Sequence, residues 1–242
     1  MSRILAVLIL AYTGLAPVAA DAGPLYGDTL LARAAHRSGA ALHIDARGKD
    51  GAPIAIGPVV TDGATVPLTD AMGHPIGTLT AAPGTRAAAT AAWLARRIYV
   101  AGNLAEPDPF VERTARAPHA DALIEKMLAR FPDLVTLALH VAPRDGGNII
   151  VASNFGRIGK PGDDDDRHVE QDGAVLREVT DGGARLAVEL PLLDRAGHII
   201  GALSTSFAVP AGTDPQARYA RAVEVRDALA SYIATRAALF AR

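Results

Sequence analysis

The sequence contains no cysteine among its 242 residues. A disulfide framework, a thiolate metal site and a cysteine nucleophile are therefore excluded. Aromatic residues make up only 5% of the chain, which argues against a surface on which bases or sugars stack. Neither sign of charge is in excess, since 24 Lys and Arg residues stand against 26 Asp and Glu residues. Nucleic acid is thus a poor candidate partner, because binding to it requires a basic face.

Common catalytic motifs are also missing. The chain has no Gly-x-Ser-x-Gly nucleophile elbow, no His-Glu-x-x-His and no phosphate-binding loop ending in Gly-Lys-Ser or Gly-Lys-Thr. The hydroxyl residues Ser204, Thr205 and Ser206 lie near His198, but they fit a β-strand better than a catalytic site. We therefore expect no enzymatic activity and no resident cofactor.

Long hydrophobic runs are scarce as well. One apolar stretch covers residues 4–15 and follows a single basic residue, Arg3. About 12 apolar residues are too few for a membrane-spanning helix, which needs roughly 20. A short apolar stretch followed by small residues is typical of a secretory signal peptide. We expect residues 1–22 to be such a peptide, cleaved after Ala20 or Ala22, and the mature protein to be periplasmic or secreted.

The sequence repeats itself internally. The segment Pro67–Thr80 recurs as Pro191–Ser204, with 8 of 14 positions identical. A weaker echo matches Ala41–Ile44 with Ala138–Val141. Because both echoes come in the same order, the chain is predicted to hold two copies of one module. The upstream blocks lie 97 residues apart and the downstream blocks 124, which leaves 27 extra residues in the second copy.

The hydrophobic pattern predicts the same element order in both copies, namely helix, hairpin, hairpin, helix. Hairpins need no crossover helix, so we expect an α+β fold with helices packed on an antiparallel sheet in each module. A shortened first module is expected at 23–105 and a complete second module at 106–242. Pro118 should kink or divide the helix that contains it. The expected helices cover 26–37, 86–101, 110–130 and the residues after Asp214; the expected strands cover 40–44, 54–56, 66–68, 76–80, 134–141, 148–153, 185–192 and 199–207.

The second copy resembles the Cache, or PDC, family of extracellular sensors, whose sheet is PAS-like. The resemblance is carried by a strand ending in Ala-Ser, a polar turn, Ile-Gly-Lys, a short acidic helix and the later Asp-Arg-Ala-Gly-His-Ile-Ile-Gly. It covers about residues 120–208, with a shortened echo over 26–80. The resemblance implies a pocket for a small ligand between the sheet and the loop after Ser153. Organic acids, amino acids and other small metabolites are the implied ligands, although the aromatic and Arg-rich helix of the amino-acid-binding subgroup is missing.

The loop after the strand that ends at Ser153 offers anion-binding chemistry. Arg157 and Lys160 supply positive charge, Asn154 supplies an amide, and neighbouring glycines let backbone N–H groups approach an anion. We predict that a small anionic ligand binds to this loop and to the adjacent strand. The predicted ligand-binding residues are Ser153, Asn154, Arg157, Lys160 and, on the adjacent strand, His140. The alternative is that the glycines only turn the chain while both cations are solvated or paired with Asp.

Metal binding is the weaker hypothesis for the acidic and imidazole side chains. The run Asp163–Asp166 offers oxygen ligands, but it lacks the alternating spacing of a calcium loop and is suited to begin a helix. The echoes match His43 with His140 and His74 with His198. These four are nevertheless ordinary strand and turn positions, so we expect no metal site, and cation binding by the Asp run stays open.

Two functional hypotheses follow. The first is an exported, Cache-type sensory protein that binds a small anionic metabolite in its second module and signals to a partner protein. The second is a periplasmic accessory protein that docks on a membrane-bound or periplasmic partner through its sheets and binds no small ligand.

Overall fold

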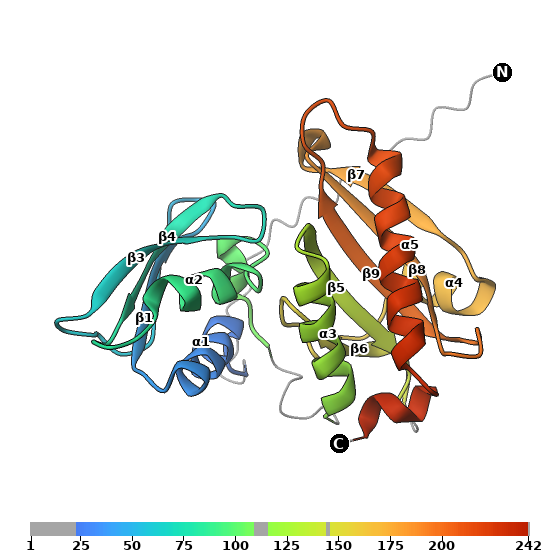
Figure 1. Cartoon of the computed structure of the whole chain (residues 1–242), viewed down its shortest axis with the longest axis horizontal. Helices are drawn as coiled ribbons and strands as arrows, with labels where there is room; N and C mark the ends of the chain where they lie inside the picture. The colour runs from blue at the N-terminus through green and yellow to red at the C-terminus, as the bar shows by residue number, and fades with distance from the viewer. Residues whose placement is uncertain (1–22, 109–115, 144–145, 242) are drawn as a thin grey trace.

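The computed structural model describes residues 23–108, 116–143 and 146–241. Two modules lie side by side, each built on one antiparallel sheet (Figure 1). The expected α+β fold is confirmed in this respect. The signal peptide predicted for residues 1–22 lies outside the described residues. Within the described ranges, no helix is long and apolar enough to cross a membrane.

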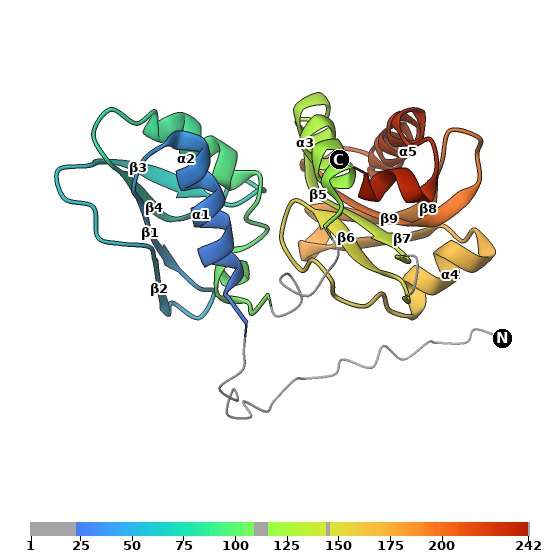
Figure 2. The ribbon, with the colours of Figure 1, turned by 90° about the horizontal axis from the view of Figure 1, so that it is seen from below.

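The first module has a four-stranded sheet in the order β2-β1-β4-β3. Helices α1 and α2 pack on one face of this sheet (Figure 2). Residues along β1 alternate, so that Leu42 and Ile44 are buried under the helices while Asp45 and Arg47 are exposed on the other face. The elements are α1 (Tyr26–Ser38), β1 (Leu42–Arg47), β2 (Pro53–Ile56), β3 (Ala64–Thr69), β4 (Pro75–Ala81), α2 (Ala87–Ala95) and the 3-10 helix η1 (Ala101–Ala105).

The second module has a five-stranded sheet in the order β6-β5-β9-β8-β7. Helices α3 and α5 cover one face, and the short helix α4 lies against the other (Figure 2). The elements are α3 (Pro118–Arg130), β5 (Leu134–Val141), β6 (Ile149–Ser153), α4 (Asp164–Asp172), β7 (Leu176–Thr180), η2 (Asp181–Gly183), β8 (Arg185–Leu193), β9 (Ile199–Ala208), α5 (Pro215–Tyr232) and η3 (Arg236–Phe240).

The repeated Asp-x-x-Gly-His sequence forms the same hydrogen-bonded turn in both modules. The Asp70 carboxylate accepts hydrogen bonds from the backbone N–H groups of Met72 and His74, at 2.9 and 3.0 Å. Asp194 accepts the equivalent pair of hydrogen bonds, one of them from His198, both at 2.9 Å. The sequence repeat is therefore a structural repeat, and the residues that recur in it hold a turn between two strands.

The strand register shifts the alignment of the weaker repeat, Ala41–Ile44 with Ala138–Val141, by two residues. Ile44 on β1 pairs with Leu79, and Leu139 on β5 pairs with Leu203. Since Leu79 and Leu203 are equivalent positions of the stronger repeat, Ile44 corresponds to Leu139. The upstream offset is then 95 residues rather than 97, and the second module carries 29 extra residues rather than 27.

This correction changes which histidines correspond. His43 is not the counterpart of His140, because His140 lies at the position of Asp45 in the first module. The Leu-His pairs in the two copies match by sequence alone, while the backbone pairing aligns residues two positions further along. The extra residues of the second module include α4 and β7, which have no counterpart in the first sheet.

Two expected helices begin or end elsewhere. The helix predicted over 86–101 ends at Ala95, where the Arg97 N–H bonds to the Leu94 carbonyl while the Arg97 guanidinium donates to the Trp93 carbonyl. The Arg96 carbonyl accepts a hydrogen bond from Asn154 Nδ2, and the Arg97 carbonyl accepts one from the Tyr26 hydroxyl, both at 2.7 Å.

Pro118 does not kink a helix, because it is the first residue of α3. A proline fits this position, where its missing N–H group would have no helical partner. The earlier part of the predicted helix includes residues 109–115, which lie outside the described ranges.

Replacing Gly201 with alanine should destabilise the second module. A Cβ atom there would lie 2.1 Å from the His140 carbonyl oxygen, so β5 and β9 would have to separate. We expect the free energy of unfolding to fall by about 2 kcal/mol or more, measured by urea denaturation. Gly102→Ala is the control, because its Cβ would meet nothing within 4 Å. Equal stability of the two variants would contradict this account of the strand contact.

Candidate functional site

The two faces of the second sheet differ in chemistry. On β5, Leu137 and Leu139 belong to the apolar core under α3 and α5. The β5 residues that alternate with these leucines face the side of α4 and are small or polar. The residues paired with them on β9, and those paired in turn on β8, are also small or polar. We call this surface the polar face. It comprises Thr136, Ala138 and His140 on β5, Ser204 and Ser206 on β9, and Ala187 and Glu189 on β8.

Helix α4 lies on the polar face through its first turn. Asp163 is the N-cap, and its carboxylate accepts a hydrogen bond from the Asp166 backbone N–H at 3.2 Å. The Asp166 side chain in turn accepts one from the Asp163 N–H at 3.1 Å. This reciprocal capping box fixes the direction of the Asp166 side chain. The other oxygen of that carboxylate, Oδ1, lies 2.9 Å from His140 Nδ1.

Four side chains meet at this point, and we call them the His140 cluster: His140, Asp166, Glu189 and Ser204. The Ser204 hydroxyl lies 3.2 Å from His140 Nε2 and 3.4 Å from Glu189 Oε1. His140 is 8% exposed and Asp166 3%, so the cluster is closed over by α4. Burial of this many ionisable groups is costly unless each one has a partner.

The partners are incomplete. Glu189 Oε2 is buried and has no hydrogen-bond partner. His140 Nδ1 and Asp166 Oδ1 are close enough for an ion pair, yet they are not aligned as a hydrogen bond. Buried polar atoms without partners are rare in folded proteins, and they indicate a place for a water molecule or a ligand. The polar face is therefore a candidate binding site.

The environment separates the two carboxyl groups of the cluster by pKa. Burial raises the pKa of Glu189 to about 7, and the nearby charge of Asp166 adds to this shift. Burial also acts to raise the pKa of Asp166, but the adjacent His140 and the hydrogen bonds with Asp163 together lower this pKa below its ordinary value. Near neutral pH Asp166 is thus ionised while Glu189 exchanges a proton.

Asp166, His140 and Ser204 contact one another in sequence, as do the carboxylate, imidazole and hydroxyl of a catalytic triad. Ser204 lies on β9, the central strand, and is paired with residues of β5 on one side and β8 on the other. Backbone N–H groups of a central strand are used by the neighbouring strands, so none is free to stabilise an oxyanion. The arrangement is better suited to binding than to acyl transfer.

The predicted loop residues Ser153 and Asn154 lie at the contact between the modules. The Ser153 hydroxyl donates to the carbonyl of Gly156 within the loop. Asn154 is 3% exposed and accepts a hydrogen bond from the Leu137 N–H at 2.7 Å. Its Nδ2 group donates to the carbonyls of Val135, at 2.9 Å, and of Arg96 in the first module, at 2.7 Å.

Arg157 binds a carboxylate of the protein itself, that of Glu106, which the structure places with the first module as the residue that caps the end of η1, one residue beyond the expected boundary. The Nε and Nη2 groups of Arg157 donate to the two oxygens of Glu106, at 3.0 and 2.9 Å. Lys160 is exposed and makes no ion pair among the described residues. The ligand role predicted for these loop residues stays a prediction. An external carboxylate at Arg157 would have to displace Glu106.

The loop connects this module contact to the His140 cluster. After Arg157 the chain runs along β6, where the Gly159 N–H donates to the Ile150 carbonyl at 2.8 Å and the Gly162 N–H to the Asn148 carbonyl at 2.9 Å. It then enters α4 and reaches His140 through Asp166. Three members of the cluster were not among the predicted site residues. The alternation along β8 could have indicated Glu189, because its neighbours on the strand are buried apolar residues.

Metal binding has little structural basis in the described ranges. No group of three or more His, Asp or Glu side chains there is placed to hold a metal ion. In the acidic run, Asp163 and Asp166 cap α4 and each other.

Glycine conformation also contributes to the contact between the modules. Gly156 has a φ angle of +83°, and a Cβ atom at this position would lie 2.4 Å from the ring of Tyr26. Its backbone therefore packs directly on α1 of the first module.

Comparison with known proteins gives few matches. No protein-family model matches the chain, and no curated protein matches it. Solved structures similar to part of it include a putative GAF sensor protein from Burkholderia vietnamiensis, with 15% identity over 49% of this chain and 76% of that one, at a TM-score of 0.34. The C-terminal domain of the E. coli transcriptional regulator KdgR has 16% identity over 50% of this chain and 97% of that one, at 0.32.

A putative IclR-family transcriptional regulator from Rhodococcus sp. has 13% identity, over 65% of this chain and 71% of its own, at a TM-score of 0.34. These structures are described as a GAF sensor protein and as transcriptional regulators, one of them of the IclR family, whereas the sequence motifs resemble the Cache family.

Glu189→Gln should change how stability depends on pH. The folded protein keeps a proton on Glu189 up to about pH 7, while the unfolded chain loses it near the ordinary pKa of 4.5. The contribution of Glu189 to the free energy of unfolding therefore falls as pH rises from 4.5 to 7 and is constant above. We expect the variant to be more stable than the parent by about 1 kcal/mol at pH 8, after allowance for partial exposure, and equal to it near pH 4. Urea denaturation at several pH values measures this.

Glu178→Gln, an exposed change on β7, is the control for that experiment. A stability difference that is the same at pH 4 and pH 8, or equal pH responses of the two variants, would contradict the assignment to Glu189.

Asn154→Ala should uncouple the two modules. It removes the hydrogen bond to the Arg96 carbonyl and leaves buried groups of β5 without partners, at a cost of about 2 to 4 kcal/mol. The single tryptophan, Trp93, lies on α2 and reports on the first module, while circular dichroism reports on both. We expect the two urea transitions to separate in this variant and to coincide in Lys160→Ala. Coincident transitions in both would show that Asn154 does not join the modules.

Proposed function

We propose that the chain is an exported sensory protein of the Cache type, without enzymatic activity, that binds a small anionic metabolite on the polar face of its second module. The observation that supports this is the His140 cluster, in which a buried imidazole faces a carboxylate from a short helix while neighbouring polar atoms lack partners. In this proposal residues 1–22 direct export, and the ligand signal passes to a partner protein.

Asp166 occupies the position that a ligand carboxylate would take. Its ionised oxygen lies against His140, and the capping box holds it there. A ligand carboxylate that binds His140 and accepts a hydrogen bond from Ser204 would displace Asp166 and loosen the first turn of α4. Glu189 in its protonated form would then donate a hydrogen bond to the ligand carboxylate.

Displacement of α4 would be transmitted along the chain. The segment before α4 runs along β6 and begins at the loop that carries Asn154 and Arg157. Both residues contact the first module, through the Arg96 carbonyl and the Glu106 carboxylate. A change at the ligand site would thus alter the contact between the modules, which is the mechanical requirement for signalling.

This geometry favours His140 over Arg157 as the main ligand contact. Two N–H donors of Arg157 already bind the two carboxylate oxygens of Glu106. His140 Nδ1 and Asp166 Oδ1 are not aligned as a hydrogen bond, so an external carboxylate could gain a hydrogen bond that Asp166 does not make.

A binding experiment with matched variants tests the proposal. The mature protein is screened against a library of small organic acids by thermal shift, and hits are measured by calorimetry. A ligand at a hundred times its dissociation constant should add about 2.7 kcal/mol to stability. Asp166→Asn removes the internal competitor and should tighten binding at least tenfold, while His140→Gln should abolish it. Asp172→Asn, an exposed change on the same helix, is the control and should bind as the parent does.

Equal affinities of the parent and Asp166→Asn would show that Asp166 does not compete with the ligand. Absence of any shift in both proteins across the library would contradict ligand binding. That result would favour the alternative of an accessory protein that acts by docking on a partner.

A further inference from the structure

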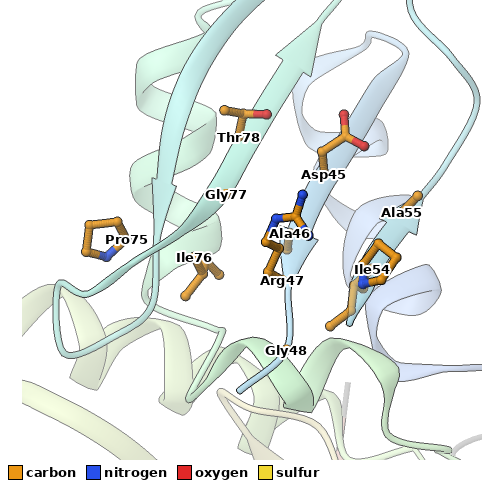
Figure 3. Close-up of a pocket in the computed structure, with 11 residues that line it drawn as sticks. Asp45, Ala46, Arg47, Gly48, Ile54, Ala55, Pro75, Ile76, Gly77 and Thr78 are labelled. Carbon is orange, nitrogen blue, oxygen red and sulfur yellow. The ribbon is translucent and has the colours of Figure 1, made fainter. Parts of the chain in front are cut away.

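The first module contains a hollow at the end of its sheet where β1 and β4 cease to pair. It has a volume of about 660 Å³, which is in the range of sites for small molecules. Figure 3 shows it from the side of the sheet that the helices leave uncovered. Apolar side chains of β2 and β4 form its walls, and two charged side chains of β1 lie over it: the wall residues are Pro53, Ile54, Pro75 and Ile76, and the charged residues are Asp45 and Arg47.

The internal repeat shows what covers this surface in the second module. Asp45 corresponds to His140, and by the same pairing Ile54 corresponds to Ile149. There, the segment from Gly159 to Asp166 runs along β6 and brings its carboxylate onto His140. The first module lacks this segment, so the hollow is the space that a carboxylate-bearing chain fills in its copy.

Of the two charged side chains at the hollow, the Arg47 guanidinium is the one that can bind an external anion. Asp45 lies 3.3 Å from His43 and forms an ion pair with it when the imidazole is protonated. Arg47 donates one hydrogen bond to the Gly51 carbonyl, at 3.2 Å, and makes no ion pair among the described residues. A guanidinium has five N–H donors and can bind a carboxylate through two of them at once.

We propose that this hollow is a second binding site, selective for a small monocarboxylate with an apolar body. The carboxylate binds Arg47, as the Asp166 carboxylate binds His140 in the second module. The apolar body packs against Ile54, Ile76 and the two prolines, where burial of hydrocarbon contributes to affinity. Asp45, close to Arg47 on the same face of β1, repels a second negative charge and so excludes dicarboxylates.

Calorimetry and ligand-observed NMR with 4-methylpentanoate as the probe test this site. We expect saturable binding of one molecule by the parent, and at least a tenfold loss of affinity in Arg47→Gln. Arg47→Lys should retain part of the affinity, and Asp45→Asn should increase it. The uncharged amide of the same acid should not compete. Lys49→Gln, an exposed change in the adjacent turn, is the control and should bind normally.

The His140→Gln variant separates this site from the one in the second module, since binding of the probe should survive it. Loss of probe binding in His140→Gln with normal binding in Arg47→Gln would overturn the proposal and leave the second-module site intact. Equal binding by the parent and Arg47→Gln would overturn it as well. So would a concentration-dependent dimer that Arg47→Gln abolishes, because the hollow would then receive a second copy of the chain.

Discussion

The contact that fixes the first turn of α4 on the polar face is the one between the Asp166 carboxylate and His140, at 2.9 Å. The sheet beneath this turn carries small and polar residues, and Val169 is the apolar side chain that α4 buries completely. The ion pair supplies one directed attraction, and the capping box orients the carboxylate that makes it. Removing either partner would leave an uncompensated charge in a buried place. Helix α4 is therefore held on the polar face by one contact between ionisable side chains and by the packing of one apolar side chain.

The two modules share their turns and close strand approaches, yet they differ in what lies on the free face of the sheet. In both, a carbonyl oxygen of the first strand comes so near a glycine that no side chain fits, at Gly77 and at Gly201. The second module adds α4 and β7 beside this shared framework. One framework thus presents an imidazole under a helix in one copy, and a carboxylate and a guanidinium at an open hollow in the other.

Much of the architecture could be predicted from periodicity, and the failures have local causes. The hairpins follow from alternation of apolar residues and from Asp-Gly turns, and the duplicated turn could be found from identity alone. The end of α2 could not be predicted. The residues that follow it, Arg96 and Arg97, bond through their carbonyl groups to side chains distant in sequence. The exposed edge strand β7 has no alternation of buried and exposed residues and gives no signal. His140 was chosen from the sequence, while its partner Asp166 was considered only as part of an acidic run.

Tyr26 and Gly156 set the distance between the modules. The ring of Tyr26, on α1, packs against the backbone of Gly156, and even a methyl group at residue 156 would overlap this ring. The angle at which one sheet meets the other thus depends on the smallest side chain in the protein. A side chain at residue 156 would push on the ring of Tyr26, which is part of the first core, so a substitution there would disturb the first core and the contact between the modules together.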